Sequence, residues 1–411
     1  MTTKIAVTGI GLVTSLGASR EENWRRLLAG DCGISPMTTF DVEGFRSRIA
    51  AQVFMPAIDA ALSPLERRRL SRGDRIGLHA ATEAIEDAGI LEPSLDRTRV
   101  GVFLGAGTAD LLRNEDFYRT WITKGLAHAR PSDAWSHFLS TPVDAIAAKF
   151  GLEGPRGCVV AACSSSTIAI GRAVEAIRSG RADATLAGGT DAIARLTFSG
   201  FNVLRLMDPA PCRPFDRSRA GMNIGEGAGI LVLERMDRAV RRGARIYAEL
   251  AGHSLGCEAF HPTAPEPEGR PVAAILALAL QDARVNAGDI DHVNAHGTAT
   301  RQNDIAESRG LRTILGDRVR RVPVTSIKSM IGHCLGAAGA VEAAVVALSV
   351  ARGAIPPTIH HGETDEACPV NVVANQAQER RLGVAVSTSL GFGGNDSAIV
   401  FRAVSQPTAT A

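Results

Sequence analysis

Short apolar runs alternate with longer helical patterns along the whole chain. Residues 5–7, 100–104, 183–189 and 229–233 have the length and aliphatic character of buried strands, and the second and third of these runs end in glycine turns. Residues 75–88 repeat apolar side chains at intervals of four, which is typical of an amphipathic helix. Alternation of this kind predicts an α/β fold, with parallel or mixed sheets covered by helices.

A cysteine stands where one apolar run gives way to a helical pattern. Residues 159–166 read Val-Val-Ala-Ala-Cys-Ser-Ser-Ser, and an amphipathic pattern follows at 168–177. A thiol near the N-terminus of a helix feels the positive end of the helix dipole, which lowers its pKa and favours the nucleophilic thiolate. A lone cysteine in an α/β chain is more often buried and inert, so a catalytic role for Cys163 depends on the residues that accompany it.

Three further segments support a catalytic role for Cys163. His296 lies in Val-Asn-Ala-His-Gly-Thr-Ala-Thr (293–300), and His333 ends Ser-Ile-Lys-Ser-Met-Ile-Gly-His (326–333). A glycine-rich turn, Leu-Gly-Phe-Gly-Gly-Asn-Asp, occupies 390–396. In this order the four motifs resemble the β-ketoacyl-acyl-carrier-protein synthases, most closely the elongating type with a Cys-His-His triad. The resemblance runs nearly end to end, from residue 7 to residue 401.

The resemblance implies a particular fold within the α/β class. This is the thiolase fold, in which two βαβαβαββ halves form a five-layer αβαβα sandwich. We expect residues 1–242 to form the N-terminal half, which carries the nucleophile, and residues 243–411 to form the C-terminal half, which carries both histidines. No Gly/Ser-rich or Pro-rich linker separates them, so the join near Arg242 is expected to be rigid.

The same resemblance assigns catalytic roles. Cys163 would hold an acyl group as a thioester, and the backbone N–H groups of Cys163 and Phe392 would form an oxyanion hole. Gly391 and Gly393 would let that turn approach the nucleophile closely, with Phe392 also acting as a gate. His296 and His333 would donate hydrogen bonds to the carbonyl of the extender thioester and stabilise its enolate.

A lysine in the second histidine motif is informative because the chain otherwise uses arginine. Lys328 is the sole lysine after residue 150, so a compact ammonium is favoured at this position over a planar guanidinium. The resemblance implies that Lys328 holds the second half of the site in place and keeps the neighbouring histidine neutral by charge repulsion. Glu307, a residue expected to be as much structural as catalytic, is a plausible partner for it.

Substrate and carrier positions are also implied by the resemblance. The phosphopantetheine arm would meet Thr298 and Thr300. Thr108 would lie at the end of the acyl pocket, where a bulky aliphatic residue is common in the family, and Thr263 would lie in a mobile loop at 260–265. The substrate-binding residues are thus Thr298, Thr300, Thr108, Phe201 and Thr263. Arg68, Arg69 and Arg205 would face an acidic acyl carrier protein.

Composition excludes several classes of protein. The formal net charge is only +2 over 411 residues, so no nucleic-acid partner is indicated. The seven cysteines include no CxxC pair, and the pair His292 and His296 fits a strand end better than a helical metal site. We expect no catalytic metal and no cofactor beyond the 4'-phosphopantetheine of the carrier. Some members of the family hold a structural monovalent cation near the active site, and the sequence leaves that open here. The chain enters a strand pattern at residue 5 and shows no apolar run near membrane length, so we expect a cytoplasmic protein with no membrane partner.

The expected reaction is a decarboxylative Claisen condensation of malonyl-carrier with an acyl group on Cys163, giving a 3-oxoacyl-carrier. Fatty-acid elongation and a specialised polyketide or polyene pathway both remain open, and Ser164 to Ser166 look more like the polyketide members. Two alternatives are a chain-length partner subunit of a heterodimeric ketosynthase and a coenzyme A-dependent thiolase. His333 disfavours the thiolase, and Cys163 disfavours the partner subunit. A homodimer is expected, and a heterodimer with a homologous subunit is possible.

Overall fold

The chain folds into two half-sheets that repeat one strand order. The computed structural model describes residues 3–91, 95–108 and 111–404. In the N-terminal half the order is β1-β7-β6-β4-β5, and in the C-terminal half it is β8-β15-β14-β9-β10, with β12 added at the edge. In both halves the first two pairings are antiparallel and the next two are parallel. The strands are β1 (Ile5–Val13), β4 (Val100–Gly105), β5 (Arg156–Val159), β6 (Ala184–Asp191), β7 (Gly227–Arg235), β8 (Ala248–Cys257), β9 (His292–Asn294), β10 (Pro323–Thr325), β12 (Asn371–Val372), β14 (Val384–Gly391) and β15 (Asn395–Arg402).

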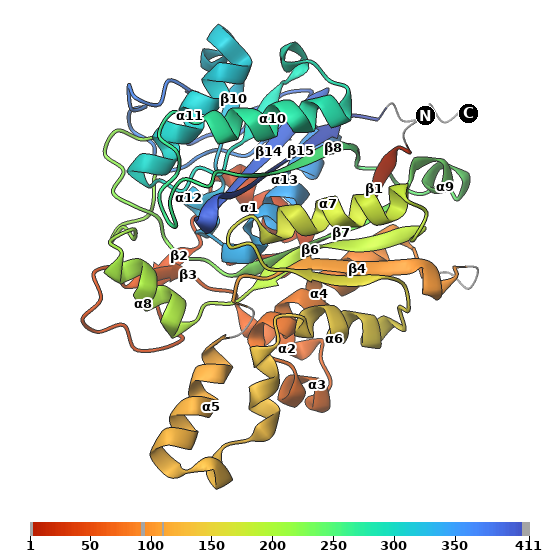
Figure 1. The fold of residues 1–411 in the computed structure, drawn as a ribbon, viewed down its shortest axis with the longest axis vertical. Helices are drawn as coiled ribbons and strands as arrows, with labels where there is room; N and C mark the ends of the chain where they lie inside the picture. The colour runs from red at the N-terminus through yellow and green to blue at the C-terminus, as the bar shows by residue number, and fades with distance from the viewer. Residues whose placement is uncertain (1–2, 92–94, 109–110, 405–411) are drawn as a thin grey trace.

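Helices cover both outer faces and fill the space between the half-sheets. Figure 1 shows the layers in order: α10 and α11, the C-terminal half-sheet, α7 and α13, the N-terminal half-sheet, then α4 and α6. The half-sheets join where β1 pairs with β8. This is the duplicated five-layer αβαβα sandwich of the thiolase fold, as predicted. The helices of the layers are α4 (Arg72–Ala88), α6 (Thr141–Phe150), α7 (Ser165–Arg178), α10 (Arg270–Ala283), α11 (Arg301–Leu315) and α13 (Ala338–Arg352).

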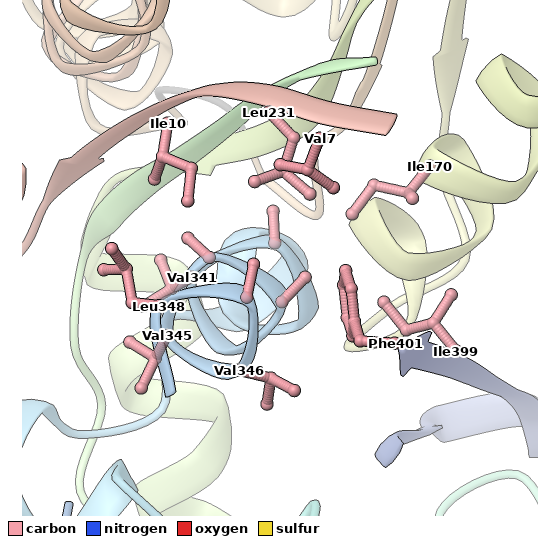
Figure 2. Packing of buried hydrophobic residues seen from close by; sticks show 14 of the residues in the cluster. Val7, Ile10, Ile170, Leu231, Val341, Val345, Val346, Leu348, Ile399 and Phe401 are labelled. Atoms are coloured by element: carbon pink, nitrogen blue, oxygen red, sulfur yellow. The ribbon is translucent and has the colours of Figure 1, made fainter. Parts of the chain in front are cut away.

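The central layer explains why α13 lacks a polar face. Figure 2 shows Val341, Val345, Val346 and Leu348 of this helix surrounded by side chains of both half-sheets and of α7, among them Phe401. Among the described residues, one segment is long and apolar enough to cross a membrane, residues 335–352 with a mean hydropathy of 1.5. The segment is 89% buried inside the molecule, as expected for the core helix of a globular fold.

Most element predictions are confirmed, with longer bounds. The helix predicted at 75–88 begins three residues earlier, because Ser71 and Asp74 form a reciprocal capping box at its start. The strand predicted at 5–7 runs on to Val13 and is buried throughout. β5 ends at Val159, so the residues before Cys163 belong to a turn rather than to a strand.

The repeat places the two candidate catalytic turns at matching positions. Cys163 lies between β5 and α7. Counted along the chain, β5 is the third strand of its half-sheet, and α7 is the helix that this half contributes to the central layer. His333 lies between β10 and α13, which have the same places in the other half. The glycine turns after β4 and β14 lie at different positions of this repeat, because β4 corresponds to β9 and β14 corresponds to β6 in the two strand orders. A half boundary at residue 242 stays a prediction.

Further helices lie outside the layers. They are α1 (Arg20–Ala29), α2 (Met55–Ala60), α3 (Pro64–Arg69), α5 (Leu111–Lys124), α8 (Arg195–Val203), α9 (Met236–Arg241) and α12 (Lys328–Ile331). Figure 1 shows α5 projecting from the body of the molecule beyond the N-terminal half-sheet.

Candidate active site

Three residues far apart in sequence converge at one point. The sulfur of Cys163 and a ring nitrogen of each of His296 and His333 lie within 4.8 Å of one another. The imidazole centroids are 5.3 Å apart and the rings are nearly perpendicular, at 84°. All three side chains are buried, and all line a pocket of about 700 Å³. The same three donors are close enough together to be a candidate metal-binding group, and the expectation of no catalytic metal stays a prediction.

The turn that carries Cys163 is strained and held by serine hydroxyls. Ala162 has a φ of +49°, a conformation that non-glycine residues rarely adopt. The Ser165 hydroxyl donates to the Ala162 carbonyl at 2.6 Å and accepts from the Ala161 N–H at 2.8 Å. Ser164 donates to the carbonyl of Asn395 at 2.6 Å and so ties this turn to the β14–β15 turn. The serine run therefore has a local structural role that was not apparent from the sequence.

The expectation of a depressed thiol pKa is wrong for the resting site. Burial raises the pKa of Cys163 to about 11, although the Lys328 charge and a hydrogen bond from the Phe392 backbone act in the opposite direction. Cys163 is therefore a neutral thiol at pH 7. Lys328 and the Phe392 backbone favour the thiolate, but their effect on the thiol pKa is smaller than that of burial.

His333 is held in one orientation and one tautomer. The Leu335 N–H donates to Nδ1 of His333 at 3.2 Å, which leaves the proton of a neutral ring on Nε2. Its backbone is fixed on both sides, by His333 N–H to the Asn223 carbonyl at 2.7 Å and Gly225 N–H to the His333 carbonyl at 2.9 Å. Nε2 is buried and has no hydrogen-bond partner within the described part of the chain. The ring thus presents an unused N–H donor.

His296 is oriented by two charged residues. Lys328 Nζ lies 3.4 Å from Nδ1 of His296 and donates to its carbonyl at 2.6 Å. Glu307 accepts from the His296 N–H at 2.7 Å and from the Gly297 N–H at 2.8 Å. Burial, the Lys328 charge and His333 hold the pKa of His296 well below 6.5. Burial and Lys328 do the same for His333, so both rings are neutral at pH 7.

The partner predicted for Lys328 is wrong. Its ammonium forms a buried ion pair with Glu342 of α13, whereas Glu307 bonds the His296 turn and the Thr388 hydroxyl. Burial raises the pKa of Glu342 to about 7, and Lys328 opposes that rise. Glu342 could have been noticed from the sequence, because it is the lone charge between residues 338 and 351.

Phe392 lines the same pocket as the triad, and its roles as gate and donor stay predictions. Its backbone hydrogen-bonds Cys163, and Gly393 beside it has a φ of +78°. The Phe392 ring lies 5.6 Å from the ring of Phe201 on α8, and both line the pocket. The Gly393 N–H donates to the Pro262 carbonyl at 2.8 Å. The turn is therefore connected to the loop at 260–265.

The predicted binding residues divide between two hollows. Thr298, Thr300, Thr263 and Arg205 line the pocket with the triad, and the two hydroxyls of Thr298 and Thr300 lie 2.9 Å apart. Thr108 does not line that pocket. It borders a second, largely apolar hollow of about 820 Å³ beside α5, and its hydroxyl donates to Asp191 at 2.8 Å.

The two remaining carrier-binding predictions lie elsewhere. Arg68 and Arg69 are exposed on α3 and line neither hollow. Their contact with a carrier stays a prediction.

Comparison with known proteins assigns the class. The model of the β-ketoacyl synthase N-terminal domain matches residues 2–239, and that of the C-terminal domain matches residues 247–362. A 3-oxoacyl-[acyl-carrier-protein] synthase 2 from Synechocystis sp. is 34% identical over 406 residues, covering 97% of this chain and 98% of its own.

Two solved structures are similar over 98% of this chain and 100% of theirs. One is the ishigamide ketosynthase/chain length factor, with a TM-score of 0.93 and 35% sequence identity. The other is a type II PKS acyl-carrier protein in complex with its ketosynthase bound to the hexaketide, with a TM-score of 0.91 and 32% sequence identity. The fold and the relatives thus define a condensing enzyme of the acyltransferase class. The chain belongs to the β-ketoacyl synthase family.

Proposed function

We propose that this chain is a 3-oxoacyl-[acyl-carrier-protein] synthase that elongates an acyl chain by decarboxylative condensation with malonyl-carrier. The observation that carries the proposal is the convergence of one thiol and two neutral imidazoles on a single pocket. A thiol can hold the growing chain, and two N–H donors can stabilise an enolate oxygen.

The first half-reaction is acyl transfer. The Cys163 sulfur attacks the thioester of an acyl-carrier, and the carrier thiol leaves with the proton that Cys163 loses. The oxyanion of the tetrahedral intermediate would be stabilised by the backbone N–H groups of Cys163 and Phe392. The backbone hydrogen bond from Phe392 to Cys163 supports this assignment, because the donor already faces the reacting sulfur.

The second half-reaction is condensation. Malonyl-carrier places its thioester carbonyl against Nε2–H of His296 and His333, and loss of carbon dioxide gives an enolate that these donors stabilise. The enolate carbon attacks the acyl group on Cys163, and the thiolate of Cys163 leaves as the 3-oxoacyl-carrier forms. Lys328 supports this step by keeping both rings neutral, since an electrically neutral donor does not require burial of a further charge.

The substrate would reach the site on a carrier protein. Thr298 and Thr300 would hydrogen-bond the phosphopantetheine arm, which is supported by their position in the lining of the pocket, and the exposed Arg205 at the pocket supports an acidic carrier. We propose no other cofactor. Relatives described as ketosynthase/chain length factor pairs support a dimeric assembly, with a second copy or a homologous subunit.

The test is intact mass spectrometry of the wild type and Cys163→Ala after incubation with a panel of acyl-carrier proteins. We expect an acyl adduct on the wild type alone. Labelling by acetyl-coenzyme A but by no carrier would replace the proposal with a thiolase. The absence of any adduct, with activity appearing only on addition of a homologous subunit, would instead assign a partner role.

A further inference from the structure

A buried carboxylate outside the triad connects two turns. One turn follows β4 and carries Thr108, and the other follows His333. Asp191 is the last residue of β6 and is fully buried. One carboxylate oxygen, Oδ2, accepts from the Gly107 N–H at 2.8 Å and from the Gly336 N–H at 2.7 Å. The other, Oδ1, accepts from the Thr108 N–H at 3.0 Å and from its hydroxyl at 2.8 Å. Asp191 therefore binds two turns, one from each half of the fold.

The close approach of these turns requires glycine. A Cβ on Gly336 would lie 2.2 Å from the Gly107 nitrogen, and a Cβ on Gly107 would lie 2.8 Å from Oδ2 of Asp191. Either contact is much shorter than ordinary van der Waals separation. The backbone around the carboxylate is thus built to bring several N–H donors onto one acid, an arrangement that a packing role alone does not need.

The turn held by Asp191 is the turn that sets the state of His333. Leu335 precedes Gly336 directly, has a φ of +52°, and donates its N–H to Nδ1 of His333. Non-glycine residues adopt this conformation only when their surroundings impose it. The Gly336 N–H, one residue further on, is fixed by Asp191. Release of Gly336 would let Leu335 relax and would remove the hydrogen bond that keeps the His333 proton on Nε2.

We propose that Asp191 is a positioning residue for condensation, which fixes the turn at 333–337 and thereby keeps the Nε2–H of His333 directed at the extender thioester. This rests on the proposed function, and it assigns Asp191 to the second half-reaction alone. Asp191 makes no hydrogen bond to the Cys163 turn among the described residues, and its charge acts to raise the pKa of the Cys163 thiol. Removal of that charge would favour the thiolate, so the loss of Asp191 should not slow acyl transfer by this route.

The test compares Asp191→Ala with Asp191→Asn. Alanine removes all acceptors, whereas one amide oxygen can still accept from both Gly107 and Gly336. We expect Asp191→Ala to acylate Cys163 at nearly the wild-type rate and to condense about ten- to a hundred-fold more slowly. Asp191→Asn should recover a large part of that loss. Equal losses in both half-reactions, or no loss in condensation, would overturn the proposal.

A matched control separates positioning from general destabilisation. Glu234 is also a fully buried acid, and it lies at the opposite end of the same strand ladder, where it pairs with Ala184 while Asp191 pairs with Gly227. Glu234→Gln removes a buried charge that bonds Thr8 and Arg242. We expect it to lower stability while leaving the ratio of condensation to acylation unchanged.

A spectroscopic readout tests the geometry without any activity. In ¹⁵N-histidine-labelled protein, with His333 assigned by comparison with His333→Asn, the wild type should show an unprotonated Nδ1 and a protonated Nε2. Asp191→Ala should shift this signal toward a mixture of tautomers. A wild-type His333 with the proton on Nδ1 would refute the proposal even if the alanine variant failed to fold. Failure of the wild type to condense any substrate would count against the proposed function only.

Discussion

At the scale of single residues, burial determines the charge state of the site. It raises the pKa of Cys163 and lowers those of His296 and His333, so the triad rests as three neutral groups. The position of Cys163 before a helix suggested a thiolate from the sequence, but a helix terminus is a partial charge and desolvation of a fully buried thiol is the larger effect. A local pattern can identify the nucleophile, whereas its pKa depends on residues from the other half of the fold.

The buried histidines predict how stability depends on pH. The pKa of each ring in the folded protein lies below that of the unfolded chain, about 6.5, so the unfolded state binds more protons below this pH. The contribution of these two rings to stability should therefore fall as the pH drops below 6.5, by about 1.4 kcal/mol per pH unit for each ring. Urea unfolding between pH 7.5 and 5 measures the slope. In His333→Asn the free energy of unfolding should decline less steeply with falling pH, by about the contribution of one histidine. An unchanged slope would show that His333 is not held neutral.

At the scale of elements, a buried ion pair joins α12 to α13 inside an otherwise apolar layer. Lys328 begins α12 and Glu342 lies on the first turns of α13, each only 2% exposed at the side chain. Sequence reasoning located Lys328 by its rarity but chose Glu307 as its partner. Nothing in the sequence shows that α11 directs Glu307 to backbone N–H groups, while the central helix brings Glu342 to the ammonium. The order of the motifs and the type of each element could be predicted from the sequence. Which side chains pair between different elements could not.

Removal of one member of this pair should be costly. Glu342→Ala leaves the Lys328 charge buried without its partner and should lower the free energy of unfolding by about 3–5 kcal/mol. The double variant Lys328→Met/Glu342→Leu should recover much of that stability while remaining inactive. Glu21→Ala is the control, because it breaks the exposed pair with Arg352 of the same helix, which should cost about 1 kcal/mol or less. A single-variant cost for Glu342→Ala no larger than the control would contradict a charged buried pair.

At the scale of the whole molecule, the projecting helix α5 and the neighbouring α8 present an apolar face. Tyr118, Trp121 and Ile122 of α5 are exposed, as is Leu196 of α8. The second hollow is lined by Tyr118, Ile122 and Leu196 from this set. A soluble monomer rarely displays such a surface. The thiolase fold and its five layers could be predicted from motif order, but this surface could not, because it depends on which side of α5 the N-terminal half covers.

We expect this face to bury itself in a dimer. Size-exclusion chromatography with light scattering should show twice the mass of the 43.1 kDa chain, and Ile122→Asp should shift the species to monomer. Ile122 is 81% exposed, and Val240 on α9, 55% exposed, gives the matched control Val240→Asp, which should remain dimeric. A wild type that is monomeric alone and associates only with a homologous subunit would establish the heterodimer. A wild type that associates neither with itself nor with a homologous subunit would contradict the proposed role of this face.

The most direct test of the central claim separates the two half-reactions in a single turnover. Wild type, His296→Ala and His333→Ala are first acylated on Cys163 and then mixed with malonyl-carrier, and product, adduct and carbon dioxide are measured together. The wild type should release one carbon dioxide for each 3-oxoacyl-carrier, two carbons longer than the acyl group that Cys163 loses. Each histidine variant should accept the acyl group yet retain it, with condensation slower by about a hundred-fold or more. Undiminished condensation in both variants would contradict the assignment of the two imidazoles.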